Sequence, residues 1–509
     1  MLTAGGGARL RARLRWPAYL GLSLVLPVTL LGGCGPDRTQ TASQISRPNI
    51  LVVIADDWSR PHAGAYGDPA VLTPAFDRVA REGVLFQNAF VSAPSCTPSR
   101  AALLTGQFHW RLEESANLWS TLQASIPVYP DILEETGYFV GFTLKGWGPG
   151  RHEVGGRSRN PAGNQFRHFD QFLEQRPNSQ PFCFWFGSFD PHRPYDEGSW
   201  QPAGLNPDRV EVPPHLPDDP VVRHDIADYL AEVERFDRAL DRLLRRLEEV
   251  GEAGDTMVVV TSDNGMPFPR CKANLYDCGA RVPLAIRWPA RVSPGRRVEQ
   301  FVSLTDLAPT FLEAAGLPVP AVMTGRSLLP ILLGEKDATD RSYVLSGKER
   351  HTPCQETGNP GGTPMRAIRT KEFLYVRNFH PERWPAGTPD YQNAFIPGAW
   401  YADVDNGPTK LLMIERREAG EPWKRLYELS FAHRPAEELY DLAQDPAQLR
   451  NVAQDPEYAA IRAELATRLE EELRRTGDPR LSSDPDQLER FPYYGHGPRY
   501  PGWKASEPQ

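Results

Sequence analysis

Two short apolar runs stand out from the mixed pattern of the chain. Residues 49–55 read NILVVIA and residues 256–261 read TMVVVT. Runs of this length, rich in β-branched residues, are typical of central parallel strands buried on both faces. Each run is followed at once by acid and amide side chains, namely Asp56 and Asp57, and Asp263 and Asn264. We therefore expect two buried strands to carry these groups at their carboxyl ends, where open α/β sheets bind ligands.

Between the two runs the apolar spacing changes to that of a helix. Apolar residues recur at every third or fourth position from Ile226 to Leu247, and Gly251 follows. This spacing predicts a long amphipathic helix that packs on the sheet as a crossover connection. The alternation of helix and strand over residues 48 to about 345 indicates the α/β class with a mainly parallel sheet.

From about residue 365 the pattern becomes one of short alternating strands. They are expected near residues 365–369, 372–376 and 438–442, with a helix from about 458 to 476. The stretch 380–409, rich in Pro, Gly and aromatic residues, is expected to be a long loop. The sequence thus predicts a large α/β domain over residues 48–360, a smaller C-terminal α+β subdomain with an antiparallel sheet over residues 361–480, and a C-terminal tail over residues 481–509.

The N-terminus has the pattern of an export signal. Four arginines between residues 9 and 15 precede an apolar stretch, residues 20–31, that is too short and too interrupted by proline to span a membrane. Residues 1–34 are therefore predicted to be a signal peptide. Its end, LGGC, resembles a bacterial lipobox, which predicts lipidation of Cys34; a plainly secreted form is the alternative. Residues 35–47 are then a polar tether, and we expect a periplasmic or cell-surface lipoprotein that touches the membrane through its lipid anchor only.

Composition and charge narrow the classes of function. Hydrophobic residues make up 40% and charged residues 24% of the 509 residues, which is ordinary for a globular protein. The net charge is -8 and no basic stripe is present, so nucleic acid is not an expected partner. Only eight of the 57 basic residues are lysines, so each lysine position is informative. The sequence gives no indication of oligomeric state.

The cysteines are six in number, and two of them are close in sequence. Export permits disulfides. Cys271 and Cys278 are near enough to close a short loop, but the sequence leaves open whether they pair.

Asp56, Asp57, Asp263 and Asn264 form a candidate metal site. A set of oxygen donors without His or Cys favours Ca²⁺ or Mg²⁺ over zinc. The alternative is that acids after a strand serve as turn or helix-capping residues.

The sequence Cys96-Thr97-Pro98-Ser99-Arg100 is the most specific motif in the chain. One interpretation of the motif is structural, namely a buried cysteine before a proline turn that leads into a helix over residues 99–104. The pattern Cys-x-Pro-x-Arg followed by AALLTG also resembles the signature of the formylglycine-dependent sulfatases. In that family the cysteine is oxidised to formylglycine, and its aldehyde hydrate attacks the sulfur of the substrate.

The resemblance extends over residues 48 to about 480 and implies roles for individual residues. It implies an alkaline-phosphatase-like fold and one Ca²⁺ ion, in preference to Mg²⁺, bound by Asp56, Asp57, Asp263, Asn264 and an oxygen of modified Cys96. It also implies that Arg100 orients the aldehyde hydrate, that Lys145 and Lys272 contact sulfate oxygens, and that His192 donates a proton to the leaving group. Each lysine has the alternative of being a solvated loop residue, and the histidine that of a structural one.

One residue departs from the family pattern. The family commonly has Lys-x-His at the first lysine, whereas this chain has Trp147 two residues after Lys145. An indole cannot donate a proton to a leaving group as an imidazole does. Either His192 therefore acts alone or another residue, such as His152, supplies the missing function.

Within the family the segments SDNGMPFP (262–269), NLY (274–276) and DPHR (190–193) resemble those of the heparan N-sulfatases. This implies hydrolysis of N-sulfoglucosamine in heparan-type glycosaminoglycan fragments, after maturation by a formylglycine-generating enzyme. It also brings Lys348 and His351 near the sugar, although the segment 346–351 is equally typical of an exposed charged loop. Three alternatives stay open: an O-sulfatase on another glycan, a phosphonate monoester or phosphodiester hydrolase of the same superfold, and a non-catalytic lipid-anchored glycan-binding protein.

Overall fold

The computed structural model describes residues 47–177, 180–335 and 341–504. The predicted signal peptide, with Cys34, and all but the last residue of the predicted tether lie outside the described residues. Within the described part of the chain, no helix is both long enough and apolar enough to cross a membrane.

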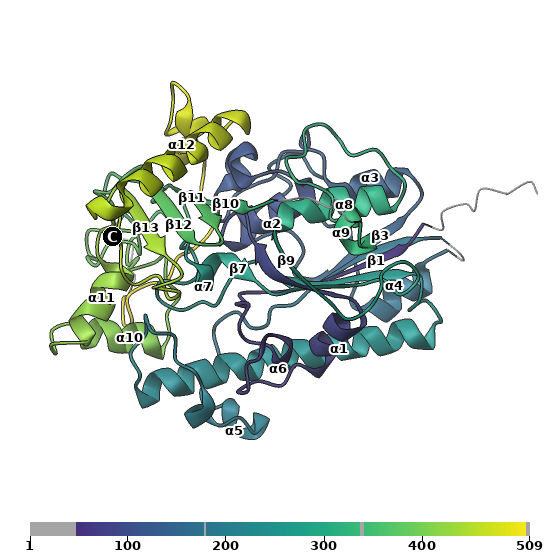
Figure 1. Ribbon diagram of the computed structural model, residues 1–509, viewed down its shortest axis with the longest axis horizontal. Coiled ribbons are helices and arrows are strands. Elements are labelled where there is room, and N and C mark those ends of the chain that lie inside the picture. The colour runs from purple at the N-terminus through teal and green to yellow at the C-terminus, as the bar shows by residue number, and fades with distance from the viewer. Residues whose placement is uncertain (1–46, 178–179, 336–340, 505–509) are drawn as a thin grey trace, which may run out of the picture. The chain divides into compact units, whose positions relative to one another are not determined.

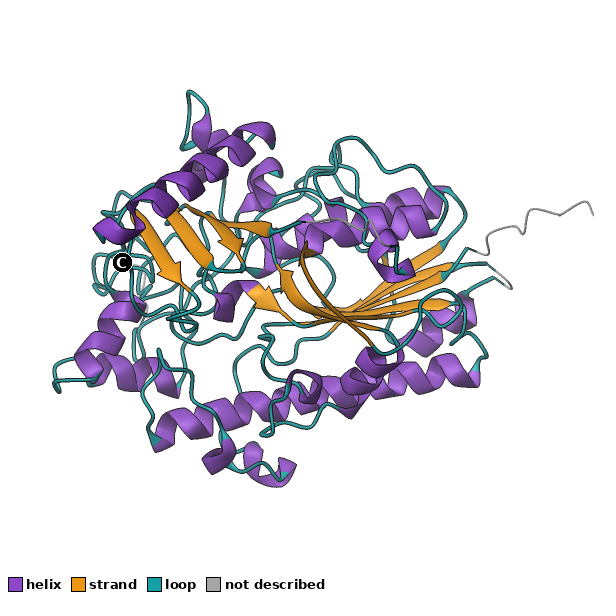
Figure 2. Cartoon of the chain, in the orientation of Figure 1, coloured by secondary structure: helices purple, strands orange, loops and turns teal. Residues whose placement is uncertain are grey.

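A central sheet of nine strands organises the described residues (Figures 1 and 2). Its order is β4-β3-β5-β1-β6-β8-β2-β7, and β9 pairs with β2. Strand β1 pairs in parallel with both β5 and β6, while β7 and β8 run antiparallel to their neighbours. The expected α/β class with a mostly parallel sheet is confirmed. The strands are β1 Asn49–Ala55, β2 Val84–Phe90, β3 Phe139–Leu144, β4 Asn164–Gln165, β5 Phe182–Gly187, β6 Thr256–Ser262, β7 Arg281–Val282, β8 Leu284–Arg287 and β9 Arg296–Ser303.

Helices cover both faces of this sheet (Figure 1). Alternate residues of β1 point to opposite sides: Val52 packs with apolar residues of α2, α3, α8 and α9, and Val53 with those of α1, α4 and α6. This burial on both faces explains why β1 is apolar at nearly every position. The helices are α1 Pro74–Glu82, α2 Cys96–Thr105, α3 Tyr129–Glu135, α4 Phe169–Gln175, α5 Trp200–Ala203, α6 Pro220–Glu249, α7 Asp277–Ala280, α8 Leu307–Ala314 and α9 Leu329–Leu333.

The long helix α6 confirms the predicted crossover helix. The Asp219 side chain caps its first turn by accepting a hydrogen bond from Val221 N at 2.9 Å, and Pro220 occupies the first helical position, where its missing N–H costs nothing. The buried face of the helix includes Ile226, Val233 and Leu240.

A second sheet of four antiparallel strands lies in the C-terminal part of the described chain (Figure 2). The strands are β10 Tyr343–Lys348, β11 Met365–Thr370, β12 Phe373–Asn378 and β13 Glu437–Asp441. The sheet therefore takes its first strand from residues before position 361. Helix α12 (Ala459–Arg475) packs on it through Leu465, Leu469 and Leu473. Residues 379–407 contain no helix or strand, and α10 (Pro408–Glu415) and α11 (Trp423–Phe431) follow.

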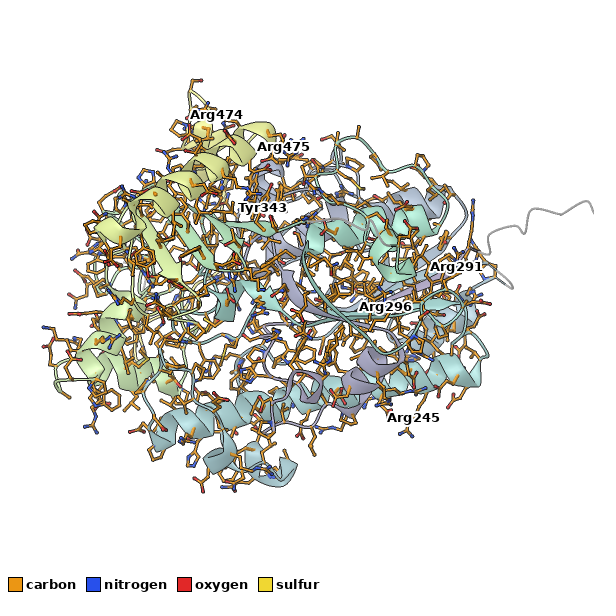
Figure 3. All side chains as sticks on the ribbon, in the orientation of Figure 1. Arg245, Arg291, Arg296, Tyr343, Arg474 and Arg475 are labelled. Atoms are coloured by element: carbon orange, nitrogen blue, oxygen red, sulfur yellow. The ribbon has the colours of Figure 1, made fainter. Side chains whose placement is uncertain are left out.

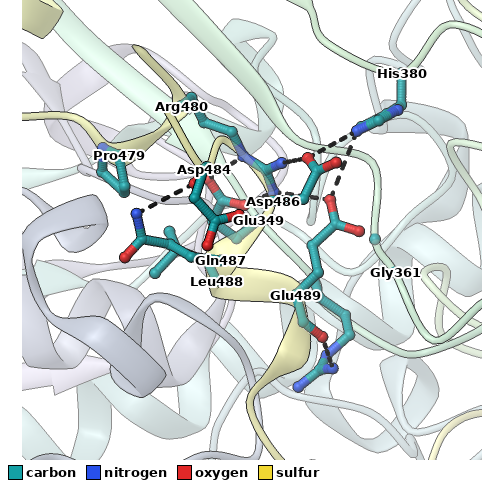
Figure 4. A network of polar contacts seen from close by, with 12 residues as sticks. Glu349, Gly361, His380, Pro479, Arg480, Asp484, Asp486, Gln487, Leu488 and Glu489 are labelled. Atoms are coloured by element: carbon teal, nitrogen blue, oxygen red, sulfur yellow. Dashed lines mark hydrogen bonds and ion pairs between the residues drawn. The ribbon is translucent and has the colours of Figure 1, made fainter. Parts of the chain in front are cut away.

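A buried ion-pair network connects the second sheet to the C-terminal segment (Figure 4). Glu349 Oε1 accepts a hydrogen bond from Arg366 at 2.6 Å, and its other oxygen accepts one from Arg480 at 2.5 Å. Arg480 also pairs with Asp486 and Glu489. Glu349 and both arginine side chains are fully buried, so each charge depends on its partners.

Arginines on the surface are paired locally. Arg245 of α6 and Arg474 and Arg475 of α12 project from exposed parts of their helices (Figure 3). Each contacts a carboxylate three or four residues earlier on the same helix. Such exposed pairs contribute about 0.3–0.5 kcal/mol each, so they favour helix formation only weakly.

Candidate active site

The carboxyl ends of β1 and β6 form the floor of the site. Ala55 and Ser262 are partners in the register of these parallel strands, so the residues that follow lie side by side. Asp57 N donates to Asp263 Oδ1 at 3.1 Å, and Asn264 Nδ2 donates to Asp57 Oδ1 at 2.6 Å. Asp57 adopts a left-handed backbone conformation with φ 75°, which is rare outside glycine and typical of functional sites.

Cys96 begins helix α2 and faces this floor. Its Sγ lies 3.5 Å from Asp56 Oδ1, and one donor atom each from Asp56, Asp57, Cys96 and Asp263 lie within 4.8 Å of one another. Burial raises the pKa of the Cys96 thiol well above its ordinary value. The thiol is therefore not activated as a thiolate, which agrees with a cysteine that acts only after chemical conversion.

The residues present fit a hard divalent cation. Asp56, Asp57 and Asp263 contribute carboxylates, and all three are at most 1% exposed. Asn264 Oδ1 is buried and accepts no hydrogen bond from the described residues, although its Nδ2 is fully used. A buried amide oxygen of this kind is costly unless a cation satisfies it. The set of three carboxylates and one amide oxygen suits Ca²⁺ or Mg²⁺.

Arg100 connects the helix that begins at Cys96 to the acid cluster. It lies one turn after Cys96 on α2, and its Nε donates to Asp263 Oδ2 at 2.7 Å. Its Nη1 donates to the carbonyl oxygens of Lys145 and Gly146 at 3.0 and 3.1 Å. Arg100 is fully buried, and its Nη2 makes no hydrogen bond to the described residues. The guanidinium therefore has one donor available for an oxygen near Cys96.

Lys145 and Lys272 both reach the acid cluster, and their contact with sulfate oxygens stays a prediction. Lys145 Nζ donates to Asp56 Oδ2 at 2.6 Å, and Lys272 Nζ donates to Asp57 Oδ2 at 2.7 Å. Burial would raise the pKa of Asp56, but Lys145, followed by His192 and Arg100, lowers it far below its ordinary value. Asp263 differs, because burial raises its pKa to about 6 in spite of Arg100. The two ammonium groups thus contact different carboxylates of the cluster.

His192 lies at the open side of the cluster. Its Nδ1 is 2.5 Å from the carbonyl oxygen of Arg193, so this nitrogen carries a proton and donates it to the carbonyl. Its Nε2 lies 3.8 Å from Asp57 Oδ2, and its side chain is 32% exposed. Arg193 holds the turn through two hydrogen bonds of 2.8 Å to Asp225. The loop thus directs Nε2 toward the reacting groups.

Trp147 belongs to the core. It is 4% exposed, packs in the cluster that covers one face of the sheet, and donates from Nε1 to Ser115 Oγ at 3.3 Å. The other candidate considered for proton transfer, His152, lies 3.6 Å from Glu153 and is 31% exposed. Of these two histidines, both within the described residues, only His192 contacts the acid cluster.

His351 and Lys348 differ in what they offer to a substrate. His351 Nδ1 lies 2.8 Å from the hydroxyl of Ser95, the residue before Cys96, and burial lowers the pKa of His351 to about 4. Lys348 is 4% exposed, and its Nζ pairs with Asp403 at 2.8 Å and donates to the Pro385 carbonyl at 3.0 Å. Lys348 thus anchors the 379–407 loop in this conformation, and a direct substrate contact for it stays a prediction.

Asp405 is a site residue that the sequence did not indicate. Its Oδ2 accepts a hydrogen bond from Lys272 Nζ at 3.1 Å, so this lysine bridges Asp57 and Asp405. Burial would raise the pKa of Asp405, but Lys272, then His192 and His351, lower it well below its ordinary value. Asp405 lies in a loop with no periodic pattern, and only its spacing from Asp403 in the segment DVD distinguishes it in the sequence.

The pairing of Cys271 and Cys278, which the sequence left open, does not occur in this structure. Both are free thiols, as are Cys96, Cys183 and Cys354.

Comparisons with known proteins agree with this geometry. The profile described as Sulfatase matches residues 48–317, and the profile described as N-sulphoglucosamine sulphohydrolase, C-terminal, matches residues 271–380. N-sulphoglucosamine sulphohydrolase of Homo sapiens is 29% identical over 499 residues, covering 87% of this chain and 93% of that protein. An ulvan-active sulfatase of Formosa agariphila is 28% identical over 451 residues, covering 86% of this chain and 82% of that protein.

Solved structures share the fold. A phosphonate monoester hydrolase from Silicibacter pomeroyi aligns with a TM-score of 0.63 and 20% identity over 86% of this chain and 97% of that one. At this identity the likeness concerns the fold alone. Likeness to solved sulfatase structures confirms the alkaline-phosphatase-like class expected from the motifs.

Proposed function

Because this chain belongs to the sulfatase family, an enzyme family that hydrolyses sulfate esters or sulfamates, we propose that its substrate is N-sulfated glucosamine in heparan-type glycosaminoglycan fragments. The observation that carries this choice is the second profile, named for N-sulphoglucosamine sulphohydrolase, which covers residues 271–380. That range includes Lys272, Lys348 and His351. The Homo sapiens protein of the same name aligns over most of both chains, which supports the same substrate.

The proposed chemistry uses two groups that the chain would acquire. Ca²⁺, when bound by Asp56, Asp57, Asp263 and Asn264, would polarise the sulfate oxygens and offset the charge that develops on them. Oxidised Cys96 would supply a hydrated aldehyde as the nucleophile. We choose Ca²⁺ over Mg²⁺ because the ligands come from a rigid, fully buried protein cage, whereas Mg²⁺ usually retains several waters.

The protein's own cations bind and orient the sulfate group. Lys145 and Lys272 each lie within 2.7 Å of a carboxylate oxygen of the acid cluster, on Asp56 and Asp57 respectively, so both would reach oxygens of a sulfate bound at this cluster. Arg100 Nη2 lies 3.6 Å from Asp56 Oδ1, the same oxygen that Cys96 Sγ approaches, and would stabilise negative charge on an oxygen carried by the modified residue. These charges are buried, and a low-dielectric surrounding strengthens their effect.

His192 holds the proton that the leaving nitrogen needs. An amine leaves poorly as an anion, so cleavage of a sulfamate requires a proton donor at the nitrogen. The Nδ1–H bond to the Arg193 carbonyl fixes the ring, and in the imidazolium form a second proton on Nε2 is the one that would pass to the leaving nitrogen. The His192 side chain is 32% exposed, compared with 13% for Lys145 and 19% for Asp405, so we expect the sugar to arrive beside it.

Maturation and location complete the proposal. A formylglycine-generating enzyme would modify Cys96 during export. Cys34 would carry the lipid anchor, which places the enzyme in the periplasm or at the cell surface, where sulfated glycan fragments are available.

The experiment that tests the function compares substrates that differ in the group that is cleaved and in its position on the sugar. Sulfate release is measured for glucosamine units sulfated at N, at 6-O or at 3-O, for 2-O-sulfated uronate, and for a phosphodiester and a phosphonate monoester. The C96A variant controls for contaminating activity. We expect the highest kcat/KM for the N-sulfated unit. Preference for an O-sulfate would favour the O-sulfatase alternative, which the 28% identical ulvan-active relative supports. Preference for the phosphorus esters would contradict the assignment.

A further inference from the structure

Three metal-binding side chains meet outside the active site. His215 comes from the segment before α6, Cys271 from the loop after β6, and Cys278 from the short helix α7. His215 Nε2 lies 3.2 Å from Cys271 Sγ, and the three donor atoms lie within 4.8 Å of one another. In a tetrahedral zinc site with bonds of about 2.0–2.3 Å, donor atoms lie roughly 3.5–3.8 Å apart. His215 and Cys271 are thus slightly closer than in such a site, and movement of Cys278 by about 1 Å or less would suffice to surround one ion.

The chemistry of this cluster differs from that of the acid cluster. It contains two thiols and an imidazole, a set that selects soft or borderline cations such as Zn²⁺ and disfavours Ca²⁺. His215 is 4% exposed and Cys271 is fully buried.

The cluster borders a cavity separate from the catalytic residues. His215 and Cys278 line a cavity of about 240 Å³ that Ser59, Pro213 and Pro446 also border. The side chain of Lys272, the residue after Cys271, instead reaches Asp57 and Asp405. Lys272 and Cys271 therefore belong to one loop, but their side chains contact different parts of the protein.

The loop that carries both cysteines is tightly folded. Arg270 and Ala273 flank Cys271 and Lys272 with φ values of 70° and 59°. A left-handed conformation costs about 1–2 kcal/mol for a residue other than glycine. At Gly279 a Cβ would lie 2.0 Å from the carbonyl oxygen of Cys271, so only glycine permits this approach. The strained turn brings Cys278 back to Cys271, and a shared ligand would offset its cost.

We propose that His215, Cys271 and Cys278 bind one soft divalent cation, with Zn²⁺ the best match, and that the fourth coordination position faces the 240 Å³ cavity. The ion fixes the loop between β6 and β7 and thereby the backbone of Lys272. A disulfide between the two cysteines is the competing chemistry, but it gives no role to His215, which approaches Cys271 directly. The site is independent of the substrate proposed above.

The test uses the mature chain with the C96S substitution, because Cys96 lies in the other cluster and its thiol would confuse a metal titration. The protein is dialysed against chelator and titrated with Co²⁺, which gives near-ultraviolet thiolate-to-metal absorption only where sulfur binds. We expect this absorption to saturate at one equivalent and to disappear when Zn²⁺ is added. Zn²⁺ alone is expected to raise the midpoint of thermal unfolding.

Variants of the cluster identify the residues that bind the metal ion. C278S and H215A, each made in the C96S background, are expected to weaken cobalt binding at least tenfold. C183A serves as the matched control, because Cys183 is buried in β5, away from the cluster, and it should titrate as the parent does. Circular dichroism checks that each variant folds. If H215A does not fold, the test rests on C278S, because Cys278 is only partly buried. Equal titrations of all variants would overturn the proposal. So would a Cys271–Cys278 disulfide found by mass spectrometry in protein purified without reductant.

Discussion

Arg100 Nε donates to Asp263 Oδ2 at 2.7 Å and thus joins the helix that carries Cys96 to the acid cluster at the end of β6. The pair is fully buried on both sides. This ion pair between Arg100 and Asp263 fixes the distance between helix α2, which begins at Cys96, and the acid that follows β6.

The first prediction concerns this bond. R100K keeps the charge but loses the planar fork that serves Asp263 and two carbonyl oxygens at once. We expect kcat for sulfate release to fall by about 10²–10³-fold, as for loss of one preorganised donor at a developing anion. R245K is the control, because Arg245 is 69% exposed on α6. A loss of less than threefold in R100K would show that the fork is not needed.

The second prediction concerns Lys272 and its neutralising partner. K272A removes a sulfate contact and should lower kcat/KM by about 10²-fold, comparable to loss of a charged hydrogen bond of up to about 3 kcal/mol. D405N should have a smaller effect, about tenfold, because Lys272 keeps its bond to Asp57 while losing the one to Asp405. Steady-state kinetics on one sulfated substrate checks both. A larger loss in D405N than in K272A would mean that Asp405 contacts the substrate itself.

The third prediction separates the role of His192 from that of the sulfate-binding residues. H192Q should reduce hydrolysis of a sulfamate or alkyl sulfate by about 10²–10⁴-fold, since these leaving groups need a proton. The same variant should lose much less activity on a nitrophenyl sulfate, whose phenolate leaves unaided. K272A controls for a general loss of sulfate binding and should affect both substrates alike. Equal losses in H192Q would contradict proton donation by this residue.

The fourth prediction concerns stability and pH. Burial alone would raise the pKa of Glu349, but Arg480 and Arg366 outweigh it and lower the pKa to about 2, from the ordinary 4.5. A depressed pKa stabilises the fold above pH 4.5, and this stabilisation is lost as pH falls from 4.5 toward 2. E349Q should therefore lower the free energy of unfolding at pH 7 by about 3 kcal/mol.

Chemical denaturation at pH 7 and pH 3.5 checks this value. The difference between E349Q and the parent should shrink at the lower pH, because Glu349 has begun to lose its contribution there. E418Q is the control, because the Glu418 side chain is 86% exposed. A difference that does not change with pH would mean that packing, and not the charge of Glu349, stabilises the network in Figure 4.

The sequence predicts the elements that depend on local pattern. The β1 and β6 strands, helix α6 and the placement of Asp56, Asp57, Asp263 and Asn264 follow from apolar runs and their polar ends. The motif at Cys96 and the order of the later residues then indicate the family, and the structure brings them together.

What the sequence does not predict depends on long-range contacts. Asp405 reaches Lys272 from a loop without periodicity, and the sequence separation between them is 133 residues. Lys348, for which a sugar contact stays a prediction, forms a buried pair with Asp403 of the same loop as Asp405, and this pair too is a long-range contact. The conformation of such a loop is set by many weak contacts, including those of Lys410 with the carbonyl oxygens of Trp400 and Val404, and no local signal encodes them.

The most direct measurement of the central claim uses one substrate that carries both kinds of sulfate. Glucosamine sulfated at N and at 6-O is incubated with the mature enzyme, and the first product is identified by mass spectrometry and NMR. The account predicts a product with a free amine that keeps its 6-O-sulfate, and no product from C96A. Release of the 6-O-sulfate first, with the N-sulfate retained, would contradict it.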